Sequence, residues 1–133
     1  MPPLVLIVDD NERNAKLTSD VLELAGMRTL SAATASEGIE LARTHQPDVV
    51  LMDIRLPDLD GGKAALELAA DKRTARIPVV ALSALPAGEA SSRLRDSGFA
   101  GYIEKPIDVL SFPEQVQRYC GSSERPGGEP PRT

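Results

Sequence analysis

Five short runs of apolar residues alternate along the chain with longer segments of helical periodicity. The first, third and fourth runs are almost continuously apolar, which is typical of strands covered on both faces of a parallel sheet. The predicted strands span residues 4–8, 28–32, 48–52, 78–83 and 101–104, and the predicted helices span residues 12–25, 35–45, 61–71, 88–97 and 111–120. This order predicts right-handed crossovers and an α/β fold with a doubly wound, five-stranded parallel sheet and five helices.

Residues that commonly start or end helices support these boundaries. Gly26 ends the first helix, because glycine tolerates the left-handed turn that closes many helices. Ser36 is the expected N-cap of the second helix, and Pro47 is its expected stop. From residue 121 onward the chain offers only small, polar and charged residues and prolines, with nothing to bury. We therefore expect one folded domain over residues 1–120 and a flexible tail over residues 121–133.

Composition narrows the range of functions. The formal net charge of −5 argues against nucleic-acid binding, which requires a basic face. No apolar run approaches the roughly 20 residues of a membrane span, and the N-terminus shows neither a basic leader nor a signal-peptide core. Cys120 is the only cysteine, which excludes an intrachain disulfide. We expect a cytoplasmic protein.

Polar residues follow the predicted strands at one edge of the sheet. Asp9 and Asp10 come directly after the first strand, Asp53 follows the third, Ser83 closes the fourth and Lys105 follows the fifth. Because the functional crevice of an open parallel sheet lies beyond the carboxyl ends of its strands, we expect these side chains to meet there. Each residue alone is readily explained as a helix cap or a turn former. Their coincidence at one edge, with no comparable cluster expected at the other, predicts a site.

Three carboxylates at one edge repel one another, by about 4 kcal/mol for a pair at ~4 Å and an effective dielectric of ~20. A divalent cation removes this repulsion, and oxygen ligands favour Mg²⁺, with Mn²⁺ as the alternative. Such a metal suits phosphoryl chemistry. A carboxylate can attack phosphorus to form an aspartyl phosphate, and a lysine ammonium can hold a phosphoryl oxygen as a point charge. The pattern therefore favours metal-dependent phosphorylation of an aspartate.

Five blocks of the sequence resemble the signature blocks of response regulator receiver domains. They occur in the order of that family and at its typical spacing, over about residues 4–120. The closer resemblance is to single-domain regulators of the DivK type. The blocks are Val8-Asp9-Asp10-Asn11, Leu51-Met52-Asp53-Ile54-Arg55-Leu56-Pro57, Asp60-Gly61, Val80-Ala81-Leu82-Ser83-Ala84 and Tyr102-Ile103-Glu104-Lys105-Pro106.

This resemblance implies a flavodoxin-like sheet with the strand order 2-1-3-4-5. It implies that Asp53 is the phosphoacceptor. It also implies a Mg²⁺ site in which Asp10 binds the ion directly and Asp9 binds it mainly through water. Asp53 itself and the backbone carbonyl of Arg55 are the further expected ligands.

The resemblance also implies which residues contact the phosphoryl group and which respond to it. Ser83 and Lys105 are the expected contacts. Tyr102 is the expected aromatic switch, which turns inward when Ser83 moves and so alters the face formed by the fourth helix, the fifth strand and the fifth helix. Arg55 and Leu85 flank the expected path of the attacking water and are predicted to tune the lifetime of the phosphoryl group.

The expected phosphodonor is a histidine kinase or a histidine phosphotransfer protein that docks near Asn11, Asn14 and residues 106–108. The switched face is then expected to bind a downstream protein target, with the chain as a monomer or a phosphorylation-dependent dimer. The alternative output is that of a phosphorelay intermediate, or of a phosphate sink without a dedicated target. Neither nucleic acid nor a membrane is an expected partner.

Three other classes of protein fit the sequence less well. A phosphatase of the haloacid-dehalogenase type needs a second aspartate two positions after the first, and this sequence has Arg55 there. A module that signals without phosphate would have lost the acidic pair, the acceptor or the lysine, and none is lost. A nucleotide-binding protein needs a glycine-rich loop where Asp9 and Asp10 stand. We therefore expect a signalling domain that promotes its own phosphorylation and dephosphorylation, and not a turnover enzyme.

Overall fold

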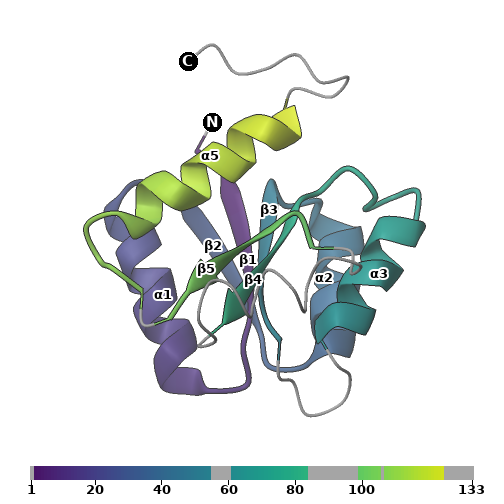
Figure 1. Cartoon of the computed structure of the whole chain (residues 1–133), viewed down its shortest axis with the longest axis horizontal. Helices are drawn as coiled ribbons and strands as arrows, with labels where there is room; N and C mark the ends of the chain where they lie inside the picture. The colour runs from purple at the N-terminus through teal and green to yellow at the C-terminus, as the bar shows by residue number, and fades with distance from the viewer. Residues whose placement is uncertain (1, 55–60, 84–98, 106, 125–133) are drawn as a thin grey trace.

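Five parallel strands form one sheet in the order β2-β1-β3-β4-β5, which confirms the predicted topology (Figure 1). The computed structural model describes residues 2–54, 61–83, 99–105 and 107–124, with only the backbone described at residues 61, 62, 83 and 121–124. The strands are β1 (Leu4–Val8), β2 (Arg28–Ala32), β3 (Val49–Asp53), β4 (Val79–Ser83) and β5 (Gly101–Glu104). The helices are α1 (Glu12–Leu24), α2 (Ala35–His45), α3 (Gly61–Ala70) and α5 (Phe112–Glu124). The helix predicted at residues 88–97 lies outside the described residues.

The sheet is covered on both faces, by α1 and α5 on one side and by α2 and α3 on the other (Figure 1). The side chains of β1 and β3 alternate between the two cores that result. Val5 and Ile7 belong to the core under α1 and α5, whereas Leu6 and Val8 belong to the core under α2 and α3. This is why both central strands read as unbroken apolar runs. The acidic residues at the ends of these two strands therefore follow segments that are completely buried.

Several predicted boundaries differ from the structure by one residue, and side-chain hydrogen bonds mark two places where the prediction was wrong, the start of β3 and the N-cap of α2. Asp48 does not open β3: its carboxylate Oδ2 accepts from the backbone N–H of Leu4 at 2.8 Å. The strand consequently starts one residue later and ends with Asp53. Thr34, and not Ser36, is the N-cap of α2, because its hydroxyl accepts from the N–H of Glu37 while the Glu37 carboxylate accepts from Ala33.

The last helix extends further than predicted. α5 continues to Glu124, so the first four residues of the predicted tail are helical. Residues 125–133 lie outside the described residues, and the flexible tail predicted there stays a prediction. Gly26 does close α1 as expected, with a φ of 94° that favours glycine. Within the described ranges, no helix combines the length and the apolar character that crossing a membrane requires.

A second group of charged residues joins α2 to α3 at the edge of the sheet opposite Asp53, where no cluster was expected. Both helices end at this edge, because β3 and β4 begin there. Arg43 lies at the centre, with its Nε 2.9 Å from Asp71 Oδ2, and Arg73 Nη2 is 3.0 Å from the same oxygen. We call this group the Arg43 cluster; it comprises Glu40, Arg43, Glu67, Asp71 and Arg73.

Candidate functional site

The two acidic residues after β1 occupy a turn whose geometry is fixed by backbone hydrogen bonds. The N–H of Asp9 donates to the carbonyl of Ala32 at the end of β2, at 3.0 Å. Asn11 then caps α1, with its side-chain oxygen accepting from the N–H of Asn14 at 3.0 Å. The turn points Asp9 inward, where it is buried, and leaves Asp10 exposed. Neighbouring carboxylates of the same sequence pair therefore have very different surroundings.

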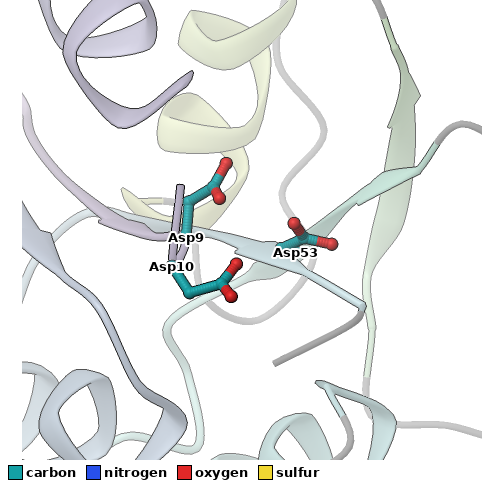
Figure 2. A group of neighbouring side chains, drawn as sticks. All are labelled: Asp9, Asp10 and Asp53. Carbon is teal, nitrogen blue, oxygen red and sulfur yellow. The ribbon is translucent and has the colours of Figure 1, made fainter. Parts of the chain in front are cut away.

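The side chains of Asp9, Asp10 and Asp53 gather at the carboxyl ends of β1 and β3 (Figure 2). One carboxylate oxygen from each lies within 4.8 Å of the other two. Lys105, directly after β5, donates from Nζ to Asp53 Oδ2 at 3.2 Å and lies 4.0 Å from Asp9 Oδ2. The structure thus brings together four of the predicted site residues, which the sequence places after three different strands. We call these four residues the acidic site.

The carboxylate of Asp9 is the least well solvated group of the acidic site. Its side chain is only 1% exposed, and its Oδ2 has no hydrogen-bond partner among the described residues. Burial raises the pKa of Asp9 above its ordinary value, and the charges of Asp53 and Asp10 act in the same direction. The N–H of Asn11, which donates to Asp9 Oδ1 at 2.9 Å, and the charge of Lys105 lower the pKa of Asp9 and oppose that rise.

The donor set of the acidic site fits a hard divalent cation. Three carboxylates converge and a single lysine is near them, so negative charge is in excess. The unsatisfied, buried Oδ2 of Asp9 is an acceptor that a cation or its water shell would satisfy. Carboxylate oxygens are the ligands that Mg²⁺ and Mn²⁺ prefer. The residues present therefore suit the metal that the sequence predicts.

The remaining predicted site residues are placed less completely. Ser83 is the last residue of β4 and pairs in register with Glu104 of β5, and only its backbone is described. Tyr102 lies in β5 and is half-buried. Arg55 and Leu85 lie outside the described residues, so the predicted metal-binding carbonyl and the predicted lifetime-tuning roles stay predictions.

A cavity beside the acidic site was not predicted from the sequence. It has a volume of about 250 Å³, and it lies between α1 and the segment that follows β5. Asp9 and Lys105 are in its wall, and Lys105 also contacts Asp53. The residues that line it are Asp9, Asn14, Leu17, Thr18, Leu82, Lys105 and Ile107. The one available signal was Leu17, an apolar residue that the structure leaves half-exposed on α1.

Comparison with known proteins agrees with this fold and this site. The model of the response regulator receiver domain family matches residues 5–117. The polar-differentiation response regulator DivK of Brucella anthropi is 40% identical over 123 residues, which cover 92% of this chain and all of that relative. The receiver domain of a sensor histidine kinase from Pseudomonas aeruginosa, solved with a magnesium ion coordinated in its active site cleft, is 30% identical with a TM-score of 0.82, over 91% of this chain and 99% of that one.

A CheY-like response regulator receiver domain protein from Methanospirillum hungatei gives the same TM-score of 0.82, at 26% identity over 93% of this chain and 98% of that chain. This chain belongs to the response regulator receiver domain family. Its curated relatives include DivK regulators, so the predicted resemblance to that type is confirmed. Receiver domains are signalling domains of two-component systems. Membership of this family therefore confirms the predicted class of function, that of a two-component signalling domain.

Proposed function

We propose that this chain is a phosphorylated signalling domain whose acceptor is Asp53 and whose reaction depends on Mg²⁺. The observation that carries the proposal is the contact of Lys105 with Asp53, 3.2 Å from Nζ to Oδ2, beside two further carboxylates. A structural ion pair would need only one carboxylate for one lysine. An excess of negative charge around a lysine-bound aspartate suits a site that takes up both a cation and a phosphoryl group.

In the proposed reaction, a carboxylate oxygen of Asp53 attacks the phosphorus of a phosphohistidine or of a small acyl phosphate. A bond forms between that oxygen and phosphorus, and the bond from phosphorus to the donor atom breaks, so the donor leaves with the electron pair. Lys105 orients the carboxylate and holds negative charge at the acceptor. Bound Mg²⁺, held by Asp9, Asp10 and Asp53 with the carbonyl of Arg55, would offset charge on the carboxylate and the phosphoryl group. Ser83 is the proposed hydroxyl contact.

The surface next to the acceptor fits a protein donor. Leu110 is 92% exposed, and Leu17 and Val109 are about half-exposed. Leu17 lines the cavity to which Asn14 and Ile107, two of the predicted docking positions, also contribute, and Val109 and Leu110 follow Ile107 closely along the chain. Large exposed apolar side chains grouped on a soluble domain mark binding surfaces. Because a phosphohistidine has to reach Asp53, we propose that a histidine kinase or a histidine phosphotransfer protein docks here.

The proposed output follows from the charge added at the acceptor. A phosphoryl group brings close to two negative charges, and Ser83 and Lys105 would move to bind its oxygens. Tyr102 would turn inward in response, and the face that contains β5 and α5 would then bind a downstream protein. The effect on the partner equals the difference in stabilisation that phosphorylation gives to the two states.

Acetyl phosphate with Mg²⁺ tests the proposal directly. The wild-type chain is expected to gain one phosphoryl group per chain, detected by intact mass, and Asp53→Asn is expected to abolish the gain because an amide is not a nucleophile of this kind. Chelation of Mg²⁺ with EDTA is expected to abolish it as well. A gain of mass that survives Asp53→Asn would place the acceptor on another residue.

The matched control is Asp20→Asn. Asp20 is an exposed carboxylate on α1 that pairs only with Lys16 in the described structure, 3.3 Å away. This variant loses the same charge at a distance from the acidic site and is expected to be phosphorylated like the wild type. Hydrolysis of small phosphate esters over many cycles per chain would contradict a signalling domain and indicate a turnover enzyme.

A further inference from the structure

The aromatic ring of Tyr119 lies directly on the backbone of Gly101. Tyr119 belongs to α5, and Gly101 is the first residue of β5. A Cβ atom placed on Gly101 would overlap the Tyr119 hydroxyl, and it would lie only 2.8 Å from the ring carbon Cζ and 3.0 Å from Cε1. No side chain other than hydrogen fits at residue 101 while the ring stays in place. At residue 101, the contact between α5 and β5 is therefore a contact between the tyrosine side chain and the main chain.

The adjacent residue in β5 is Tyr102, the predicted switch. Gly101 and Ile103 pair in register with Val80 and Leu82. Ile103, Val80 and Leu82 belong to the core under α1 and α5. Because side chains alternate along a strand, Gly101 turns its bare face toward α5. Tyr102, which pairs with Ala81, emerges from the other face of the same peptide segment. Tyr119 and the side chain of Tyr102 therefore lie on opposite faces of β5 at residues 101–102.

A ring seated on main chain transmits displacement better than a ring seated on a side chain. A flexible side chain at residue 101 would absorb a small shift of the strand by changing rotamer, whereas the backbone cannot. Tyr119 is itself fixed, since it packs against the buried core that contains Phe112, Val116 and Cys120 of its own helix. Packed interiors are close to incompressible. A shift of β5 at this point must therefore move Tyr119 or open the core.

We propose that Tyr119 is a positioning residue for the switch: its seat on Gly101 couples the rotation of Tyr102 to α5, so that α5 responds to the state of Asp53. This inference rests on the proposed phosphorylation of Asp53. Burial raises the pKa of Tyr119, and the charge of Tyr102 adds to the rise. Tyr119 takes no part in the chemistry at Asp53 and acts only through the strand.

Tyrosine fluorescence tests this coupling, because the chain has two tyrosines and no tryptophan. In the Tyr102→Phe variant, the switch position keeps an aromatic ring and Tyr119 becomes the only tyrosine. Acetyl phosphate with Mg²⁺ is added, and phosphorylation and emission are measured on the same sample. We expect the intensity of Tyr119 to change in proportion to the phosphorylated fraction. Phosphorylation with unchanged emission would overturn the inference, whereas absence of phosphorylation would overturn the proposed function beneath it.

A second variant tests whether the contact of Tyr119 with Gly101 causes the response of Tyr119 emission to phosphorylation. Gly101→Ala, made in the Tyr102→Phe background, is expected to displace the ring, so that phosphorylation proceeds but the response of Tyr119 emission is lost. Ala100→Ser is the matched control, since it adds one heavy atom at the preceding, exposed residue and is expected to keep the full response. A full response in Gly101→Ala would overturn the inference. If circular dichroism shows that Gly101→Ala does not fold, the Tyr102→Phe measurement decides alone.

Discussion

The acidic site and the Arg43 cluster are two charged groups at opposite edges of one sheet, and they are built on opposite principles. In the Arg43 cluster, two arginines face three carboxylates, and Asp71 accepts hydrogen bonds from the guanidinium groups of both Arg43 and Arg73. In the acidic site, one lysine faces three carboxylates, and a buried oxygen of Asp9 has no hydrogen-bond partner in the described structure. One group is nearly balanced, and the other has an excess of negative charge.

The pKa values of the two aspartates record this difference. Hydrogen bonds from the side chain and the backbone N–H of Arg73, with a further one from Arg43, hold the pKa of Asp71 well below its ordinary value. Burial raises the pKa of Asp9 instead. A lowered pKa means that the folded state stabilises the charged carboxylate, and a raised one means that it destabilises it. The hydrogen bonds to Asp71 therefore contribute to stability, whereas the buried charge of Asp9 reduces it.

Removing the central cation should break the balanced group and have the largest effect on stability. Arg43→Met keeps much of the apolar stem but leaves three carboxylates near one another, and we expect it to lower the free energy of unfolding by about 1–2 kcal/mol. Urea denaturation followed by circular dichroism measures this. Lys16→Met is the control, because its single pair with Asp20 is exposed on both sides and is worth at most about 0.5 kcal/mol. Equal losses of unfolding free energy in the two variants would show that Arg43 contributes no more to stability than an exposed ion pair does.

Neutralising Asp9 should have the opposite sign. Asp9→Asn keeps the shape of the side chain and the acceptor for the N–H of Asn11, but it removes a buried charge that is poorly solvated. In metal-free buffer we expect the free energy of unfolding to rise by about 1 kcal/mol. The same change at Asp10, which is exposed, is expected to have a smaller effect. A loss of stability in Asp9→Asn would show that its pair with Lys105 outweighs the cost of burial.

The smallest expected effect is a dependence on pH at the Arg43 cluster. Asp71 has a lowered pKa in the folded chain, so its stabilisation is fully present above its ordinary pKa of about 4 and is lost as the pH falls toward the lowered value. The stability difference between the wild type and Asp71→Asn should thus stay constant between about pH 7 and pH 5 and narrow below about pH 4. Denaturation curves at a series of pH values give this difference. A difference that widens in acid would have the wrong sign.

The sequence predicts the acidic site well and the Arg43 cluster not at all, for a physical reason. Asp9 and Lys105 follow a strand directly and Asp53 ends one, so their meeting point depends only on the parallel topology, which the apolar runs specify. Arg43 and Asp71 lie at the ends of two helices, and their contact depends on how α2 and α3 pack against each other. Helix packing is set by side-chain shapes along both helices, and no local pattern in this sequence expresses it.

The same limit applies to details within the predicted elements. The predicted start of β3 is one residue early, because Asp48 follows a proline and precedes an apolar run. The hydrogen bond between Asp48 and Leu4 joins residues 44 positions apart, so no local pattern indicates it. The seat of Tyr119 on Gly101 is also a long-range contact, and from the sequence alone the glycine reads as an ordinary strand start. Local propensities locate the elements, whereas long-range side-chain contacts of these two kinds come only from the three-dimensional structure.

Asp53 is the last rung of β3, in register with Leu82 of β4, and the four residues before it are completely buried. In the proposed reaction, a nucleophile built into such a strand has almost no freedom to move toward its substrate, so each phosphodonor has to place its phosphorus atom at one fixed point. The buried interior fixes the place of this reaction, and selection among phosphodonors depends on surface residues. Two chains with superimposable interiors can therefore accept phosphoryl groups from different kinases, because only their surface residues determine which kinase binds.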